Sequence, residues 1–295
     1  MPLLHTNCIN GKNRAVAFEL LSRALALLGM LPAMEELELI GGGSMGTALL
    51  HGLLSHGVVV AEQVSLVEVS EERRGELALL FPGVKLLERP VGAPQVILAT
   101  KPNHVIEALA ALRNLGVRRV LSVAAGINLA TLESAIGADV AVIRAMPNTP
   151  ALVGEGAAAM SGGSSAAEAD LAWAELILDA VGTVVRVPES QLDAVTAVSG
   201  SGPAYVFLIA EAMIEAGVLQ GLDRATADAL VRQTLLGSAR LLIDGDWDPA
   251  ELRARVASPG GTTEAALRVL QAGKLQETLI DAIAAATERS RELAG

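Results

Sequence analysis

The spacing of apolar residues divides the chain into two parts with different patterns. Between residues 37 and 187, short apolar runs alternate with longer amphipathic stretches. The runs that predict strands lie at 37–40, 63–69, 95–100, 119–124, 140–144 and 183–187. The stretches that predict helices lie at 44–55, 71–80, 103–114 and 164–181. Such alternation is typical of an α/β fold with a doubly wound parallel sheet that carries helices on both faces.

After Pro188 the strand pattern ends and only helical periodicity continues. Helices are predicted at 203–216, 223–243, 262–271 and 274–293. We therefore divide the chain near residue 187, into a sheet domain over 36–187 and a C-terminal all-helical domain over 188–295.

Residues 1–35 precede the first predicted strand. The segment from 15 to 31 is apolar, but Glu19 and Arg23 interrupt it, which favours an amphipathic helix over a secretory signal. We interpret residues 1–35 as an N-terminal extension, either a disordered addition or the product of a start codon assigned too early.

Composition excludes several classes of partner. Apolar residues make up 52% of the 295 residues and aromatic residues only 2%, so aliphatic side chains must fill the core. The net charge of −11 disfavours nucleic acid and anionic membranes, because both repel an acidic protein. The single cysteine, Cys8, rules out a disulfide within the chain and favours a cytoplasmic location. No uninterrupted apolar run reaches the roughly 18 residues that a membrane-spanning helix needs.

A glycine motif follows the first predicted strand. Gly41, Gly43 and Gly46 form G-x-G-x-x-G between that strand and the next helix. The first glycine permits a tight turn, the second lets a pyrophosphate approach the backbone, and the third permits close packing of helix and strand. The helix N-terminus then offers N–H groups to the phosphates. The motif predicts a Rossmann-type dinucleotide site, and the alternative is a flexible glycine turn.

The end of the second predicted strand carries residues suited to the cofactor's ribose. Glu68 follows Gly46 at close to the spacing of about 20 residues expected for an acid that accepts from the 2′-hydroxyl of NAD. Ser70, Arg73 and Arg74 come next and suit the 2′-phosphate of NADP instead. The sequence leaves the choice between NADH and NADPH open, and a solvated strand end is the alternative for Glu68 and both arginines.

Two further turns follow predicted strands. Lys101-Pro102 lies where the strand at 95–100 opens on the cofactor edge of a parallel sheet, so Lys101 is either a contact or an ordinary surface residue. Two prolines make the sequence MPNTP at 146–150 rigid. Asn148 in this loop presents an amide that suits a nicotinamide ring or carboxamide, and an ordinary proline turn is the alternative.

Two glycine-rich turns lie in the predicted helical domain. The sequence SGSGP at 199–203 precedes a predicted helix, in which Pro203 suits the first position and Ser201 or Gly202 the cap. The sequence SPGGTT at 258–263 leads into another helix. Because helix N-termini attract anions, the two turns predict a pocket for a small carboxylate. Two ordinary interhelical turns are the alternative.

The side chains that usually carry acid–base or metal chemistry are missing from the predicted helical domain. All four histidines, at 5, 51, 56 and 104, precede it, and it has no cysteine. We therefore expect no metal site, and any proton donor there must be a hydroxyl, a carboxylate or water. Proton donors of these kinds suit hydride addition to an acceptor that is already activated, such as a protonated imine.

Three long motifs resemble those of the pyrroline-5-carboxylate reductases, the last enzymes of proline synthesis. They are VIRAMPNTPALVGEG at 142–156, AVTAVSGSGPAYVFLIAEAMIEAGVLQGL at 194–222 and ASPGGTTEAALRVLQAGKL at 257–275. The similarity runs from about residue 36 to residue 293, with the motifs in the family's order. It implies a Rossmann domain joined to a helical dimerisation domain, a homodimer with interlocked helices, and a larger ring such as a decamer. The implied reaction is reduction of (S)-1-pyrroline-5-carboxylate to L-proline with NADPH or NADH.

The resemblance also implies roles for individual residues. Thr263 matches the catalytic threonine proposed to hydrogen-bond the imine nitrogen. The residues implied to bind the substrate carboxylate, largely through the backbone, are Gly260, Gly261 and Thr262, and those implied to shape its site are Ser199, Gly200 and Ser201. With the motifs above, the candidate cofactor-binding residues are Gly41, Gly43, Ser44, Met45, Gly46, Glu68, Ser70, Arg73, Thr100, Lys101, Pro102, Ala124 and Asn148. Glu68 departs from the family, because many members have a small polar residue there, and a preference for NADPH is therefore in doubt.

Two other functions stay open on the sequence. A β-hydroxyacid dehydrogenase or imine reductase shares the two-domain build. A hydroxyacid enzyme would be expected to place a lysine in the helical active site, and Lys274 is the only lysine after Lys101. A nucleotide-sensing or scaffold protein that has lost catalysis is disfavoured, because no motif looks degraded. All of the enzymatic alternatives act on a small molecule.

Overall fold

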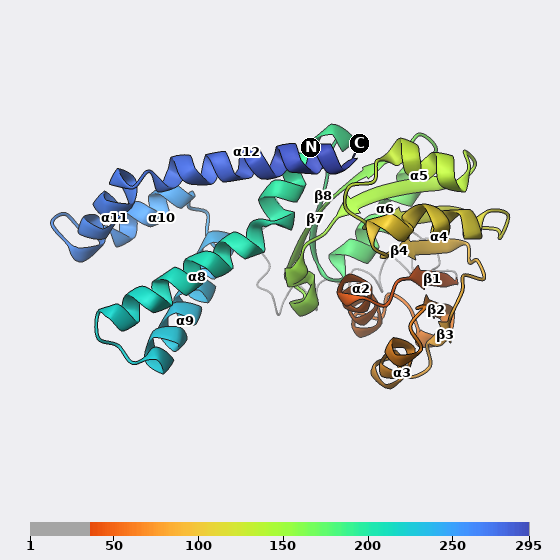
Figure 1. Ribbon diagram of the computed structural model, residues 1–295, viewed down its shortest axis with the longest axis horizontal. Helices are drawn as coiled ribbons and strands as arrows, with labels where there is room; N and C mark the ends of the chain where they lie inside the picture. Colours follow the sequence, from red (N-terminus) through yellow and green to blue (C-terminus); the bar gives the residue numbers. More distant parts are fainter. Residues whose placement is uncertain (1–35, 295) are drawn as a thin grey trace, which may run out of the picture. The chain divides into compact units, whose positions relative to one another are not determined.

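The computed structural model describes residues 36–294, so the interpretation of residues 1–35 lies outside the described part of the chain. Within that part the chain forms two compact units (Figure 1). The sheet unit comprises residues 36–203 and 285–294, and the helical unit comprises residues 204–284. The boundary predicted near residue 187 follows the last strand, and as a domain boundary it stays a prediction.

An eight-stranded sheet forms the centre of the sheet unit, in the order β3-β2-β1-β4-β5-β6-β7-β8. The strands are β1 Leu37–Ile40, β2 Val64–Val67, β3 Lys85–Leu87, β4 Gln95–Leu98, β5 Arg119–Ser122, β6 Ala141–Met146, β7 Gly156–Gly162 and β8 Gly182–Arg186. The first six are parallel, whereas β7 runs antiparallel to β6 and parallel to β8. The strand order reverses between β1 and β4, which is where doubly wound sheets bind their ligands.

Helices cover both faces of this sheet. They are α2 Ser44–Ser55, α3 Glu71–Leu80, α4 Val105–Leu112, α5 Leu129–Ile136, α6 Glu168–Asp179 and the short α7 Leu192–Val195. Successive strand residues point to opposite faces. Leu39 and Ile97 accordingly join one apolar cluster with α2, α3 and α6, while Ile40 and Leu98 join a second cluster with α4 and α5. The predicted α/β fold with a doubly wound sheet is confirmed.

The helix predicted to start at Pro203 does not start there. One continuous helical run extends from Glu189 to Leu219. Its segments are the 3-10 turn η4 Glu189–Gln191, α7, the π-helical turn η5 Thr196–Gly200 and α8 Gly202–Leu219. The N–H of Ser201 donates to the carbonyl of Thr196 at 2.8 Å, the five-residue spacing of a π-helix. Ser201 and Gly202 therefore lie inside the run and do not cap a helix.

Five more helices follow α7. They are α8, α9 Arg224–Asp244, α10 Pro249–Val256, α11 Thr262–Ala272 and α12 Leu275–Ala294. Side-chain oxygens of Asp223 and Asp248 accept backbone N–H groups three residues further on, at 3.0 and 2.9 Å, and so cap α9 and α10. The other short turns of the described chain are η1 Ala61–Gln63, η2 Pro102–His104 and η3 Thr149–Val153.

The helical unit buries almost none of its own apolar side chains. Among residues 204–284, all of which are described, only Ala227 and Val231 are buried. Phe207 and Leu208 on α8 are each 65% exposed. The run 189–219 is also long and apolar enough, by composition, to cross a membrane, a test that core helices of soluble proteins pass as well. These helices have no core of their own and need another apolar surface to pack against.

Each unit holds one of the two tryptophans, stacked with an arginine. Trp173 on α6 is fully buried, donates its Nε1–H to Gln95 at 2.8 Å, and has the guanidinium of Arg119 at 4.8 Å from its ring centre. Burial lowers the pKa of Arg119, and the nearby carboxylate of Asp170 opposes that shift.

Trp247, between α9 and α10, is 41% exposed, and the centre of its ring lies 4.1 Å from the Arg255 guanidinium.

Candidate cofactor and substrate site

The candidate cofactor residues lie at one edge of the sheet. The glycine loop follows β1, Glu68 follows β2, and Thr100 and Lys101 follow β4. Ala124 follows β5, and Asn148 follows β6. Because β1 to β6 are parallel, their carboxyl ends share an edge, which is the ligand-binding edge of a doubly wound sheet. The fold thus brings together residues that are more than 100 positions apart in sequence.

Two glycines of the loop are needed for close packing. The backbone of Gly41 has φ +109°, and a Cβ there would lie 2.6 Å from the carbonyl oxygen of Ala99. A Cβ on Gly46 would lie 2.0 Å from the carbonyl oxygen of Gly41. No side chain fits at either position, so α2 can begin directly against the end of β1.

The second glycine of the motif, Gly43, leaves space for a ligand. Gly43 is the N-cap residue of α2, and a Cβ on it would meet no atom within 4 Å. No side chain caps α2, and its first turn contains no acidic residue. Ser44 in that turn is exposed, whereas Met45 packs against the core. An open, uncapped helix N-terminus is suited to a pyrophosphate, so these residues fit a dinucleotide.

The residues after β4 and β5 extend the same edge. The hydroxyl of Thr100 is buried and makes no hydrogen bond within the described chain. Buried hydroxyls normally have a partner, so this atom is a second feature that fits a polar ligand. Pro102 begins η2, one residue before the start of the helix predicted at 103–114; Lys101 is exposed and Ala124 is buried.

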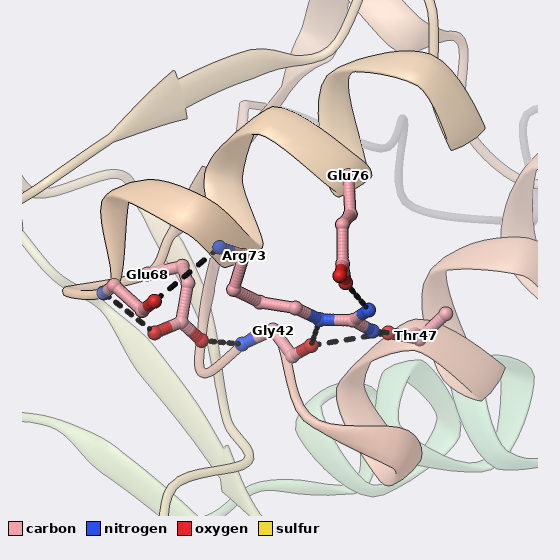
Figure 2. Close-up of polar contacts among 6 residues, drawn as sticks. Gly42, Thr47, Glu68, Arg73 and Glu76 are labelled. Carbon is pink, nitrogen blue, oxygen red and sulfur yellow. Dashed lines mark hydrogen bonds and ion pairs between the residues drawn. The ribbon is translucent and has the colours of Figure 1, made fainter.

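The acidic and basic residues after β2 contact the glycine loop. Figure 2 shows the side chains of Glu68 and Arg73 converging on Gly42. Glu68 accepts the N–H of Gly42 at 3.1 Å, and Arg73 donates its Nε–H to the carbonyl oxygen of Gly42 at 3.0 Å. Ser70 caps α3 by accepting the N–H of Arg73 at 3.3 Å. Arg74 donates to the carbonyl oxygen of Glu68 at 2.7 Å.

Asn148 joins two segments that were predicted separately. Its Nδ2 donates to the carbonyl oxygen of Ser199 at 3.0 Å, and its Oδ1 accepts the N–H of Ala157 at 2.8 Å. Pro203 has no N–H, so the Ser199 carbonyl lacks the donor that the next helical turn would otherwise supply. The buried amide of Asn148 takes that place. Its two bonded atoms fix the loop after β6 against the π-helical turn.

The π-helical turn packs closely on the same loop. A Cβ on Gly200 would lie 2.7 Å from the methyl carbon of Met146, so Gly200 packs directly against that side chain. The hydroxyl of Ser199 donates to the carbonyl oxygen of Val195 at 3.0 Å. The predicted motifs MPNTP and SGSGP thus form one local structure within the sheet unit.

The remaining candidate residues lie in the helical unit. Gly260 has φ +72° and precedes the N-cap Gly261 of α11, which begins at Thr262 and Thr263. No side chain caps α11. The N–H of Gly260 donates to the carboxylate of Glu264 at 2.5 Å. Our sequence analysis missed Glu264, although its N3 position is one from which an acid reaches back to the start of a helix.

Two family descriptions match this chain. Residues 36–126 match "NADP oxidoreductase coenzyme F420-dependent", and residues 189–293 match "Pyrroline-5-carboxylate reductase dimerisation". The pyrroline-5-carboxylate reductase of Mycobacterium tuberculosis H37Rv is 41% identical over 291 residues, which cover 90% of this chain and 98% of that protein. That of Synechocystis is 41% identical over 264 residues, covering 88% and 98%.

Solved structures give the same relationship. A pyrroline-5-carboxylate reductase from Coxiella burnetii superposes with a TM-score of 0.83 at 34% identity, covering 88% of this chain and 99% of that one. The Plasmodium falciparum pyrroline carboxylate reductase with NADP bound superposes with a TM-score of 0.77 at 28% identity, covering 89% and 99%. Both matches extend through the sheet and the helices.

The glycine loop yields a test that separates folding from binding. Gly43→Ala is expected to lower the free energy of unfolding by less than about 1 kcal/mol. The only loss expected in the folded protein is that alanine is a less favourable N-cap residue than glycine. It should weaken dinucleotide binding at least about tenfold, because a methyl group then occupies the phosphate approach. Gly46→Ala should instead destabilise the fold, because its Cβ meets backbone. Urea unfolding and fluorescence titration with NADH measure the two effects. Full NADH affinity in Gly43→Ala would contradict this placement of the pyrophosphate.

Proposed function

This chain belongs to the pyrroline-5-carboxylate reductase family, and from that premise we propose that it reduces (S)-1-pyrroline-5-carboxylate to L-proline with NADH or NADPH. The observation that carries the proposal is the extent of the relationship. Relatives at about 40% identity are matched over 98% of their length, through both the sheet and the helices. A likeness confined to the sheet would indicate only a dinucleotide-binding fold.

The residues of the cofactor edge have separate tasks in this proposal. The N-terminus of α2 and the backbone at Gly43 hold the pyrophosphate. Glu68 faces the adenosine ribose, with Ser70 and Arg73 beside it, and Thr100, Lys101, Pro102 and Ala124 line the middle of the edge. The nicotinamide, when bound, supplies the hydride. Asn148 orders the loop beside that ring, and this task is supported by its two bonds to backbone atoms.

The substrate residues need little acid–base strength. Pyrroline-5-carboxylate with a protonated ring nitrogen has an electrophilic C=N carbon. Hydride addition there breaks the π bond and gives a neutral amine, so no proton is required in that step. Thr263 would hydrogen-bond the nitrogen and orient the ring, because a threonine hydroxyl is too weak an acid to do more.

Backbone groups at the start of α11 would hold the substrate carboxylate. Gly260, Gly261 and Thr262 precede or begin that helix, whose N-terminus no side chain caps. The N–H of Gly260 is bonded to Glu264, so the substrate carboxylate would have to replace that side chain. Ser199, Gly200 and Ser201 would also contact the substrate, a role that the family motif implies.

A homodimer would supply the missing packing surface of the helical unit. The dimerisation family matches residues 189–293, which include the exposed apolar face of α8. We propose that two copies interlock these helices and that dimers assemble further, for example into a decamer. Cytoplasmic location forms part of the same proposal.

The function is tested by following NADH and NADPH oxidation with purified full-length protein. Pyrroline-5-carboxylate should support oxidation with proline as the product, whereas a panel of 2- and 3-hydroxyacids with the oxidised cofactors should give no reduction. Chromatography of the product separates proline formation from side reactions. Dinucleotide binding without proline formation would disprove the proposed activity.

Thr263→Ala is expected to lower kcat/KM for pyrroline-5-carboxylate about tenfold or more, since loss of one hydrogen bond costs about 1.4 kcal/mol. Steady-state kinetics at saturating cofactor measure the effect. Thr278→Ala is the matched control, because Thr278 lies in the same unit and its hydroxyl bonds only to the helix carbonyl of Lys274. Equal kinetics for wild type and Thr263→Ala would remove Thr263 from the mechanism.

If α8 lies at the interface of the proposed dimer, a charge introduced on this helix should disrupt the assembly. Leu208→Asp should dissociate the assembly and lower the urea midpoint at fixed protein concentration, because it places a carboxylate on the proposed apolar interface. Analytical ultracentrifugation measures the assembly. Leu79→Asp on α3 is the control, since Leu79 is 85% exposed in the sheet unit. Sedimentation of Leu208→Asp as wild type would place the interface elsewhere.

A further inference from the structure

The carboxylate of Glu68 is held in place by two backbone groups. One oxygen accepts the N–H of Gly42 at 3.1 Å and the other accepts the N–H of Ser70 at 3.0 Å. The Glu68 side chain thereby links the glycine loop to Ser70, the N-cap residue of α3 (Figure 2). A carboxylate can accept about four hydrogen bonds, so each oxygen keeps a further acceptor position. These positions lie at the end of β2, beside the loop expected to carry the pyrophosphate.

The guanidinium of Arg73 is directed at protein groups. Its Nε donates to Gly42 at 3.0 Å, and its two terminal nitrogens donate to Thr47 at 3.1 Å and to Glu76 at 2.5 Å. Three of its five N–H donors thus have partners within the protein, and Glu76 balances the positive charge. Arg74 is also engaged, with the carbonyl oxygens of Glu68 and Val69 at 2.7 and 2.9 Å. A 2′-phosphate could reach only the two remaining N–H donors of Arg73, one on each terminal nitrogen, and would compete with Glu76 for its charge.

We propose that Glu68 makes this protein select NADH over NADPH, an inference that rests on the proposed function. The acid at the end of the second strand is the group that accepts from the ribose 2′-hydroxyl in NAD-binding sheets. A 2′-phosphate has acceptor oxygens and a charge of about −1.5 to −2, so it repels a fixed carboxylate and gives it no donor. The fixed carboxylate of Glu68 therefore determines which cofactor fits at the end of β2.

The selecting residue and the phosphate loop share one peptide. Gly42 is buried, and a Cβ on it would lie 3.1 Å from Glu68 Oε2 and 2.5 Å from Leu77. Replacing Glu68 removes an acceptor from Gly42 as well as a charge from the ribose side. Substitution should therefore loosen the glycine loop for both cofactors but relieve the repulsion of NADPH alone, so the diagnostic quantity is the ratio of their dissociation constants rather than either constant alone.

The test measures dissociation constants of NADH and NADPH by calorimetry, on full-length protein without substrate and at fixed ionic strength. In wild type, the dissociation constant of NADPH should be about tenfold or more higher than that of NADH. Glu68→Ser should reduce this ratio of the NADPH to the NADH dissociation constant at least tenfold. Glu68→Gln removes the charge but keeps an acceptor for one N–H, so it should lower the ratio even if the serine variant is unstable. Glu72→Ser, with the same loss of charge on an exposed first-turn residue of α3, should leave the ratio unchanged.

Arg73→Ala tests the alternative that Arg73 binds a 2′-phosphate. We expect it to weaken both cofactors by similar factors, because it loosens Gly42 and Thr47 for either ligand. A selective loss of NADPH in Arg73→Ala, a wild type that binds NADPH as tightly as NADH, or an unchanged ratio in Glu68→Gln would each overturn the inference. Because these constants are measured without the imine, failure to form proline would contradict the proposed function and not this assignment.

Discussion

The contact between the backbones of Gly41 and Gly46 determines where the rest of the cofactor edge can lie. A Cβ on Gly46 would reach within 2.0 Å of the Gly41 carbonyl oxygen, so only glycine lets α2 start against β1. That approach places the uncapped N-terminus of α2 at the switch point of the sheet. Both polar groups of the intervening Gly42 are bound by side chains, its N–H by Glu68 and its carbonyl oxygen by Arg73. The proposed phosphate site and the proposed choice of cofactor both depend on this one backbone contact.

Local signals made most of the sheet unit predictable. The glycine motif, the apolar strands and the helices at 44–55 and 71–80 depend on neighbouring residues, and the structure has them. β7 was missed because Gly156–Gly162 is mostly alanine and glycine, which rarely form strands, and it is a strand only through pairing with β6 and β8. α10 was missed although Asp248-Pro249 and Glu251 form a capping signal.

The SGSGP turn shows what sequence cannot supply. Pro203 beside small residues predicts a helix start, and the helix nevertheless continues through it. The reason lies in Asn148, 51 residues before Ser199, whose amide satisfies the Ser199 carbonyl that Pro203 leaves without a donor. Likewise, pattern alone left the roles of Gly260 to Thr263 open, and their assignment to a substrate comes from the family motif. The bond between Gly260 and Glu264 became visible only in the structure.

The placement of the two tryptophans gives each unit its own optical reporter. Trp173 is buried in the sheet unit, and Trp247 is partly exposed in the helical unit. Their emission maxima therefore differ, with Trp173 at shorter wavelength, and quenchers dissolved in water reach Trp247 first. Loss of one signal before the other would show whether the two units melt together or in sequence.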